Sequence, residues 1–302
     1  FRIRPDGGHI DGQSGQTQFS RARDDWGNWF GCNNSYPIYH YTLADEYAKR
    51  NNHYAFPRAT TLLIEDRANY AISRYITLFN EEFNANTFTS VCGLDIYRDS
   101  LLGDAFYGNA FVGEPVHNLV FRMALAPEGA TFTARRPLGE EKKEFLASTD
   151  NWFRPVMTRT GPDGALYIAD MYRAHIEHPE YISEVDIART NFLLGNDMGR
   201  IYRVYPVGKE PRTIQALNTK KTPELVAKLD HPNPWVRDTA HRLLIESNDK
   251  TAVEPLAALA STSKNPVARV HALNVLDGLG ALDEKVLLAA LTSEHTGVVR
   301  HA

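Results

Sequence analysis

Cysteine is scarce in this chain, with Cys32 and Cys92 the only two in 302 residues. No Cys-x-x-Cys-His motif occurs, which excludes covalent attachment of a c-type haem to this stretch of sequence. The cysteines and histidines also lack zinc-type spacing, and the sequence predicts no metal site. Two interpretations of the cysteines stay open. They are a disulfide between neighbouring repeat units in an oxidising compartment, or two half-buried thiols that act as small apolar residues.

Long apolar runs and a large charge of one sign are also lacking. No run approaches the roughly 18 apolar residues that a membrane-spanning helix needs. The formal net charge of -4 at pH 7 gives no electrostatic reason to expect nucleic acid or an anionic membrane as a partner. The first eight residues contain no initiator Met and no signal-peptide pattern. They predict a strand and a turn inside a domain, so we expect the natural protein to extend upstream.

The composition changes near residue 206. Before it, short β-branched or aromatic runs alternate with turns rich in Gly, Asn and Asp. After it, Ala, Leu and Val recur at helical spacing. A chain of this length can bury more than one core. We therefore predict a β domain at residues 1–206, a linker at 207–218 and a helical domain at 219–302.

An internal repeat organises the β domain. Each copy has an apolar run, a turn, a second apolar run, a polar loop and a third apolar run. The turns contain Gly27-Asn28, Gly108-Asn109 and Asp163-Gly164, which supply the positive φ angles of tight hairpins. The polar loops are residues 33–37, 114–118 and 171–198. Such units are typical of β-propeller blades, and a β-sandwich is the structural alternative.

The number of blades sets the expected extent of the propeller. Residues 1–4 are expected to be a late strand of a preceding blade, which gives about three and a half blades here. A closed propeller needs roughly four to eight blades. We therefore expect an all-β propeller, present in part, followed by an all-α solenoid of HEAT type, with the remaining blades upstream.

The helical domain has a repeat of its own. Asn233-Pro234 and Asn265-Pro266 open two similar segments, and Arg237, Arg269 and Arg300 recur at intervals of 32 and 31 residues. Two helices in each unit of this length are typical of HEAT repeats. The third unit stops within a helix, so we expect the repeats to continue downstream.

Candidate binding residues lie where a propeller presents its ligand-binding face. That face is built from the starts of inner strands and from the loops between second and third strands. The predicted cofactor-binding residues are Glu114, His117, Asn118, Arg154, Asp170, Tyr172, Arg173, His175 and His178. Arg154 and Arg173 are the candidates to meet an anionic group. No residue is predicted to be catalytic.

Structural interpretations of these residues remain open. Glu114 and His117 can form an acid/base pair, but such pairs in turns are more often structural. His175 and His178 with Glu177 could ligate a metal ion or supply a base and its orienting carboxylate. No further metal ligand is evident, and a solvated or hydrogen-bonded loop is the alternative.

The charged residues near these loops also have simpler roles. Asp170 and Arg173 are expected to form an ion pair that shapes their loop, and Arg154 can pair with Asp150. Asn33 and Asn34 in the first polar loop are interpreted as turn formers.

Six segments of the β domain resemble one protein family. They are Gly15–Phe19 with Asp24–Asn28, Cys92–Arg98, Gly108–Val120, Glu144–Val156 and Gly161–Arg173. Together they resemble the membrane-bound dehydrogenase family of planctomycetes and verrucomicrobia. Members of that family combine a propeller similar to glucose/sorbosone dehydrogenase, a HEAT-repeat region and a C-terminal cytochrome c domain.

The resemblance implies a function. It implies a quinoprotein-like dehydrogenase that is exported to the periplasm or the cell envelope. Such an enzyme oxidises a sugar or another alcohol and passes electrons to a fused or partner cytochrome c. The implied cofactors are pyrroloquinoline quinone with calcium, and haem c in a domain outside this chain. The catalytic His of such enzymes belongs to earlier blades, so the resemblance assigns it to no residue here.

Two alternatives remain at this point. The first is a non-enzymatic propeller that binds carbohydrate or protein and carries a solenoid scaffold. The second is a hydrolase or lyase with Glu114 or Asp170 as its acid, although no matched second carboxylate is evident. A Gly-rich phosphate loop and a Ser-His-Asp order with a nucleophile elbow are both lacking.

Overall fold

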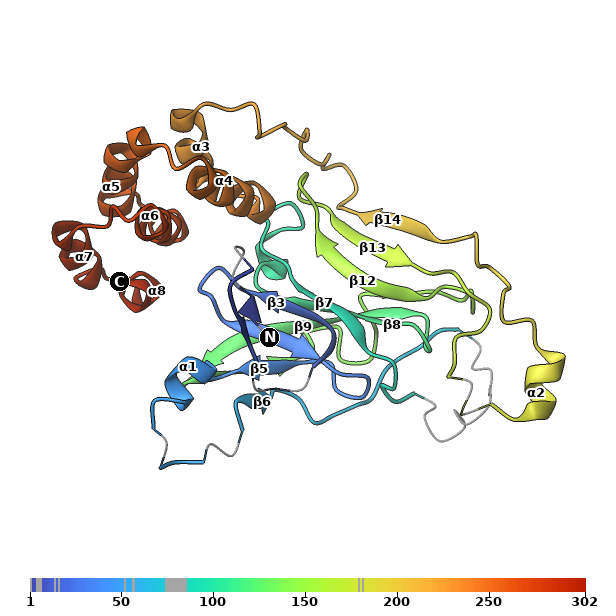
Figure 1. Cartoon of the computed structure of the whole chain (residues 1–302). Coiled ribbons are helices and arrows are strands. Elements are labelled where there is room, and N and C mark those ends of the chain that lie inside the picture. The colour runs from blue at the N-terminus through green and yellow to red at the C-terminus, as the bar shows by residue number, and fades with distance from the viewer. Residues whose placement is uncertain are drawn as a thin grey trace.

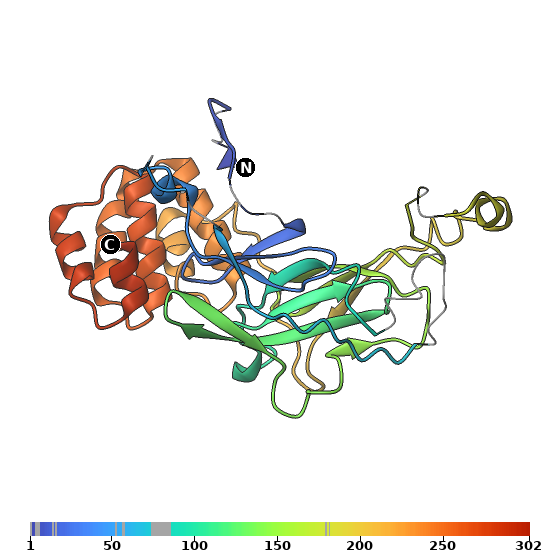
Figure 2. The same cartoon turned by 90° about the horizontal axis from the view of Figure 1, so that it is seen from below.

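The chain forms a β-rich part followed by a helical part that lies beside it (Figures 1 and 2). The computed structural model describes residues 2–3, 7–13, 15, 17–51, 53–55, 58–73, 86–178, 180 and 182–302. The strand expected at residues 1–4 lies only partly within these residues. Its described part, Arg2–Ile3 (β1), pairs with Ile10–Asp11 (β2) in a two-stranded antiparallel sheet.

Three further antiparallel sheets follow one another along the β-rich part. The first contains Gln18–Arg23 (β3), Trp29–Cys32 (β4), Tyr39–Tyr41 (β5) and Thr60–Leu62 (β6). The second contains Cys92–Ile96 (β7), Ala110–Glu114 (β8), Leu119–Glu128 (β9) and Thr131–Arg135 (β10), with Leu146–Ala147 (β11) also paired to β9. The third contains Pro155–Thr160 (β12), Leu166–Asp170 (β13) and Arg200–Val204 (β14). Strands are hydrogen-bonded in chain order, so each sheet is a meander. Two short helices, Asp45–Ala48 (α1) and Glu184–Arg189 (α2), lie in connections.

The predicted order of strands and loops is confirmed. Each of the three polar loops joins the second strand of its sheet to the third. Gly27, Gly108 and Gly164 have φ angles of 76°, 74° and 93°, as the turns were expected to require. One expectation is wrong. Gly108-Asn109 does not form a tight hairpin, because residues 97–109 with the 3-10 turn Asp104–Phe106 separate β7 from β8.

The second sheet is buried on both faces because it lies between the other two (Figure 1). Successive side chains of a strand point to opposite faces. On β8, Ala110 and Val112 therefore join a core with Phe30 of the first sheet. Phe111 between them packs with Leu166 of the third sheet.

Two glycines allow the third sheet to approach the second. A Cβ on Gly113 would lie 2.3 Å from the Pro155 carbonyl oxygen, and one on Gly93 would lie 2.4 Å from the Met157 Cα. The Thr158 hydroxyl donates to the Gly93 carbonyl across this contact at 2.7 Å. Strand β12 therefore packs backbone to backbone against β7 and β8. None of these sheets closes on itself within the residues that the structure describes.

The helical part is a series of packed helices. They are Thr222–Lys228 (α3), Pro234–Ser247 (α4), Val253–Thr262 (α5), Pro266–Gly278 (α6), Glu284–Leu291 (α7) and Thr296–His301 (α8). The repeated Asn-Pro pairs are helix starts. The side chains of Asn233 and Asn265 accept from the backbone N–H groups of Val236 and Val267, and each proline occupies the first turn. Leu244, Leu256 and Leu273 belong to the common core.

One turn of the first sheet joins the two parts. Residues 24–28, between β3 and β4, are named here the docking turn. Its Asp25 carboxylate accepts from Arg237 of α4 at 2.7 Å and from Arg98, which follows β7, at 2.8 Å. Its Asn28 side chain accepts from Arg300 of α8 at 2.5 Å.

Trp26 of the docking turn packs at the start of α8. Its ring stacks on His295 with centroids 4.4 Å apart. A Cβ on Gly297 would lie 2.2 Å from a Trp26 ring carbon, so only glycine fits at that position. Two of the three repeated arginines, Arg237 and Arg300, thus bind the β-rich part. The third, Arg269, donates to Ala260 and Ser293 within the helical part.

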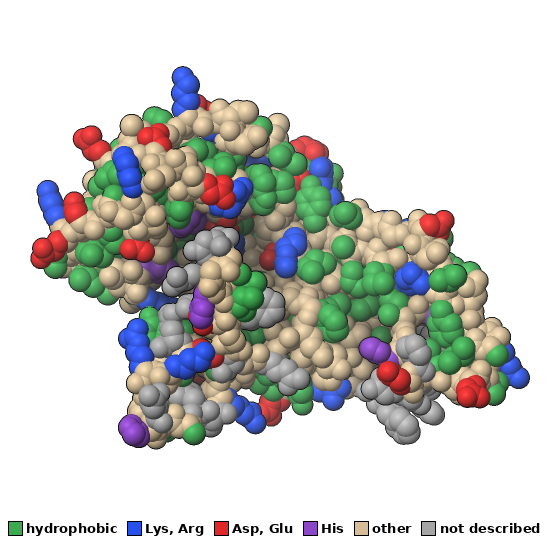
Figure 3. All heavy atoms as spheres, in the orientation of Figure 1, with side chains coloured by type: hydrophobic (Ala, Val, Ile, Leu, Met, Phe, Trp, Pro, Cys, Tyr) green, Lys and Arg blue, Asp and Glu red, His purple; other side chains and the backbone are tan. Residues whose placement is uncertain are grey.

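The molecular surface carries charges of both signs. On the face shown in Figure 3, acidic and basic side chains are interspersed over both parts of the molecule. Within the described part of the chain, no helix combines the length and the apolar character that crossing a lipid bilayer requires.

Candidate functional site

Most of the predicted site residues meet where three loops come together. The loops follow β8, precede β12 and follow β13. Residues 114–118, 150–154 and 170–175, where these loops meet, are named here the loop junction, and they include all predicted site residues except His178. The strands place these loops side by side because β12 packs directly on β7 and β8.

Arg154 lies at the centre of the loop junction and is only 7% exposed. Its guanidinium donates to the carbonyls of Pro115 at 2.8 Å, Arg173 at 3.0 Å and Ala174 at 3.0 Å. Hydrogen bonds from a charged donor to buried carbonyls stabilise this arrangement. Arg154 thus fastens the loop after β8 to the loop after β13, and its partners are carbonyls in place of the expected Asp150.

Asp170, the last residue of β13, is also buried. One carboxylate oxygen, Oδ1, accepts from the backbone N–H groups of Arg154 at 2.7 Å and Tyr172 at 2.8 Å. Arg173 donates instead to the Phe192 carbonyl at 2.5 Å. The ion pair expected between Asp170 and Arg173 is therefore wrong. Backbone groups determine the conformation of this loop.

Tyr172 lies at the edge of the loop junction. Its φ angle of 47° is left-handed, and its hydroxyl donates to Asp150 at 2.9 Å. The Arg200 guanidinium lies 3.5 Å from the centre of its ring, within the range of a cation–π contact. The hydrogen bond to Asp150 is the main cause of a raised pKa for Tyr172.

Glu114 and His117 form a fully buried pair. Glu114 Oε1 lies 3.2 Å from His117 Nδ1 and accepts from the Ser90 hydroxyl at 2.7 Å. The Asn118 side chain donates to the Phe153 carbonyl at 2.7 Å. These contacts connect the loop after β8 to its neighbours, which matches the structural interpretation of the pair.

At the end of β13 and in the loop that follows it, three buried polar atoms make no hydrogen bond within the described residues. They are Asp170 Oδ2, Arg173 Nε and His175 Nδ1. Burial, followed by the charge of Arg154, lowers the pKa of His175, so its ring is neutral at pH 7. An unpartnered buried polar group costs roughly 1–3 kcal/mol. The junction therefore offers an acceptor, a donor and a neutral ring nitrogen to a polar partner.

His178 lies outside the loop junction. Its side chain is 76% exposed, and its Nδ1 lies 3.7 Å from a Glu180 carboxylate oxygen. Among the described residues, no three His, Cys, Asp or Glu side chains are placed to ligate one metal ion.

The two cysteines lie near Glu114 in the core of the β-rich part. Both are free thiols and both are buried, so they are not joined by a disulfide. Burial is the main cause that raises the pKa of Cys32 to about 11, and it also raises the pKa of Cys92.

The loop junction does not fit the quinone that the sequence resemblance implies. Pyrroloquinoline quinone is a tricarboxylate, and its recognition calls for cationic side chains that face the ligand. Arg154 donates to three carbonyls, and the unpartnered Oδ2 of Asp170 lies in the same loop segment as Arg173 and would repel an anion. The donor set instead matches a neutral ligand whose groups both donate and accept hydrogen bonds.

Two family models match the chain. A model described as a domain of unknown function, DUF7133, matches residues 1–208, which is 208 of the 302 residues. A model of HEAT repeats matches residues 222–302. No curated protein and no solved structure matches the chain.

Proposed function

The chain belongs to the DUF7133 family, and from that premise we propose that its β-rich part forms blades of a β-propeller in an exported, quinoprotein-like dehydrogenase. The enzyme oxidises a sugar or another alcohol. Its electrons pass to a fused or partner cytochrome c. The resemblance of six segments to membrane-bound dehydrogenases of planctomycetes and verrucomicrobia supports the proposal.

The arrangement of the three meanders supports the propeller. Each begins with a strand, β3, β7 or β12, that packs against the first strand of its neighbour. Consecutive blades of a propeller have this relation around the central channel. The blades and the catalytic His that the resemblance implies belong to sequence outside this chain.

The proposed role of this chain is to bind the hydroxyl groups of the substrate. The observation that carries this role is the set of three unpartnered buried atoms beside Arg154. A hydroxyl can donate to Asp170 Oδ2 or accept from Arg173 Nε. His175 Nδ1 can either donate or accept, depending on the tautomer of its ring. A small adjustment of the loop after β13 brings these atoms to a ligand and removes the cost of their burial.

The quinone with its calcium ion is assigned to other blades, because the loop junction lacks the cations for a tricarboxylate. The helical part is proposed to be the solenoid that joins the propeller to its electron acceptor. An exported protein of this kind works in the periplasm or at the cell envelope.

A non-enzymatic, carbohydrate-binding propeller is the second candidate. The commitment of Arg154 to three carbonyls favours it, since that binding role needs no redox cofactor. The loop junction binds hydroxyl groups under both candidates.

One experiment separates them. The full-length protein that contains this chain is reconstituted with pyrroloquinoline quinone and calcium, and dye reduction is measured over a panel of sugars and alcohols. Binding of the same panel is measured by calorimetry. In His175→Phe, the contact with the Phe192 ring is kept and the ring nitrogen is lost. We expect this change to weaken binding about tenfold, by 1–2 kcal/mol. His178→Gln, on the same loop but outside the junction, is expected to bind as the unaltered protein does.

Each outcome has a distinct meaning. Dye reduction that requires a polyol supports the dehydrogenase. Glycan binding without dye reduction rules it out in favour of the binding propeller. Equal affinities of His175→Phe and His178→Gln, with both variants folded by circular dichroism, would remove the loop junction from substrate binding.

A further inference from the structure

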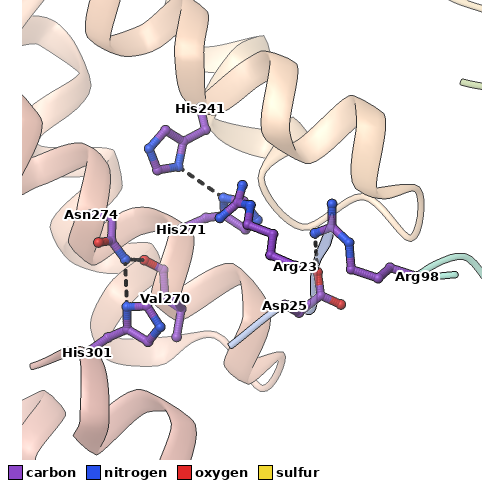
Figure 4. A pocket seen from close by; sticks show the side chains of 8 residues that line it. All are labelled: Arg23, Asp25, Arg98, His241, Val270, His271, Asn274 and His301. Carbon is purple, nitrogen blue, oxygen red and sulfur yellow. Dashed lines mark hydrogen bonds and ion pairs between the residues drawn. The ribbon is translucent and has the colours of Figure 1, made fainter. Parts of the chain in front are cut away.

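A polar cavity lies between the β-rich part and the helices. Its volume is about 250 Å³. It is lined by Arg23, Asp25, Arg98, His241, Val270, His271, Asn274 and His301 (Figure 4). The three histidines come from the second helix of each successive repeat, α4, α6 and α8. The two arginines and the aspartate come from the β-rich part, so the cavity is completed only when the two parts are docked.

Two of the histidines share one hydrogen bond. His241 Nδ1 lies 3.0 Å from His271 Nδ1, as the dashed line in Figure 4 marks. One nitrogen must carry the proton and the other must accept it, so the contact requires at least one neutral ring. If both rings were protonated, two N–H groups would face each other at this distance.

The groups that face this pair are already rich in positive charge. Arg23, Asp25 and Arg98 face it from the β-rich part, and Arg237 and Asp238 face it from α4. Three arginines and two aspartates thus surround the pair, and the arginines are in excess. Burial is the largest cause that lowers the pKa of His241 to about 4 and that of His271 to about 3. The charge of Arg23 adds to it at His241, and the charges of His241 and Arg237 add to it at His271. Asp238, whose carboxylate lies 3.8 Å from His271 Nε2, acts in the opposite direction on both rings, as Asp25 does on His271.

The hydrogen bonds of His301 also require a neutral ring. Its Nε2 donates to the Trp26 carbonyl of the docking turn at 3.2 Å, which requires the proton on that nitrogen. Its Nδ1 accepts from the Asn274 amide at 3.2 Å. Burial, and then the charges of Arg300 and Arg23, lower its pKa, although its hydrogen bond to Trp26 and the nearby Asp24 act in the opposite direction.

We propose that this cavity is a proton-operated latch, in which uptake of protons by His241, His271 and His301 releases the docking turn from the solenoid. Undocking exposes the three rings to water and separates them from Arg23, whose charge lowers the pKa of His241 and His301. The undocked form therefore binds protons more readily than the docked form. By linkage, acid shifts the equilibrium toward the undocked form.

The pH range in which the latch opens follows from the pKa values of these histidines in the docked and undocked forms. Each ring resists protonation while docked and regains the ordinary pKa near 6.5 when exposed. Docking is fully stable above pH 6.5 and weakens as the pH falls toward about 4, where His241 becomes protonated even when docked. For one such histidine, the undocking constant is expected to rise about tenfold between pH 7.5 and pH 5.5. Asp25 and Asp238 titrate below this window, because the arginines overcome burial and lower their pKa.

The test measures the distance between the two parts in the full 302-residue chain. Spin labels are attached at Glu141→Cys in the β-rich part and Lys285→Cys on α7, both at exposed positions. At pH 7.5 we expect one narrow distance distribution, and below pH 6.5 a second, broader one that grows reversibly. In the double variant His241→Gln with His271→Gln, the factor by which the undocking constant rises between pH 7.5 and 5.5 is expected to be at least tenfold smaller. His53→Gln, at an exposed position, is the matched control and is expected to follow the unaltered chain.

Three results would overturn the latch. The first is an unchanged distance down to pH 5 in a chain that is folded by circular dichroism. The second is a double variant, or the milder His241→Gln alone, that titrates as the unaltered chain does. The third involves Asp24 of the docking turn, whose pKa burial raises. If Asp24→Asn abolished the pH response while the double variant kept it, that carboxyl would be the sensor instead.

Discussion

Buried polar side chains of this protein are used mainly to tie segments of backbone together. Arg154 donates to carbonyls from two loops, and Asn118 and Asp170 bind backbone groups of the same junction. A polar group that loses its water must find such partners, and carbonyls supply them without a second buried charge. Arg154 therefore holds the segments of the loop junction together, and unpartnered atoms of Asp170, Arg173 and His175 lie beside it.

The cysteines give a prediction at the scale of single residues. The thiolate is the reactive form, and with a pKa of about 11 only about one Cys32 thiol in a thousand is ionised at pH 8. We expect iodoacetamide at pH 8 to modify neither Cys32 nor Cys92 in the folded chain and to modify both in urea. Mass spectrometry of the intact protein gives the stoichiometry. Rapid modification of the folded chain would contradict their burial.

The packing of sheets depends on small residues at the contact between elements. Gly113→Ala places a methyl group against the Pro155 carbonyl oxygen, which forces β12 away from β8. We expect it to lower the free energy of unfolding by roughly 1–3 kcal/mol, measured in urea. Gly12→Ala is the control, because no atom lies within 4 Å of its added Cβ. Equal stabilities of the two variants would argue against the close approach of these sheets.

The asparagine that begins a helix in each repeat can both cap the helix and bind another segment. Asn233 caps α4 through its side-chain oxygen, while its amide nitrogen donates to Asp99 and to the Gly161 carbonyl of the β-rich part, both at 2.8 Å. Asn265 caps α6 in the same way but donates to Asp230. The same cap residue is thus an interface residue only where its repeat meets the sheets.

At the scale of the whole molecule, Asp25 couples the two parts. Asp25→Asn leaves Arg237 buried without its carboxylate, and breaking a buried ion pair costs roughly 3–5 kcal/mol. We expect one unfolding transition in urea for the unaltered chain and two for Asp25→Asn, one for each part. Asp197→Asn, on an exposed loop, is expected to change stability by less than about 0.5 kcal/mol. One cooperative transition in Asp25→Asn would contradict this coupling.

The pH dependence of Asp25 has the same sign as that of the latch histidines but lies at lower pH. Burial alone would raise its pKa, but Arg237 and Arg98 lower it below the ordinary 3.8. Its stabilising contribution is therefore present above pH 3.8 and is lost as the pH falls through the lower, folded-state value. Acid first weakens docking through the histidines and only at lower pH through Asp25.

Local patterns in the sequence determined much of the architecture. Turn glycines, alternating apolar residues and the polar loops predicted the strands of three meanders, because these signals act within a few residues. The Asn-Pro pairs and the recurring arginines predicted the helical repeats for the same reason. The sequence also placed the candidate residues in two polar loops and at the start of a strand, although it misassigned the partners of Asp170 and Arg173.

Only the tertiary structure decided which residues meet across long separations. Asp25 and Arg237 are 212 residues apart, and nothing local distinguishes this aspartate from its neighbour Asp24. The positions of Arg154 among carbonyls and of His241 against His271 likewise depend on how β12 and the helices pack. Local propensity fixes the course of each segment, whereas burial and charge pairing between distant segments decide which polar groups are structural and which can respond to a ligand or a proton.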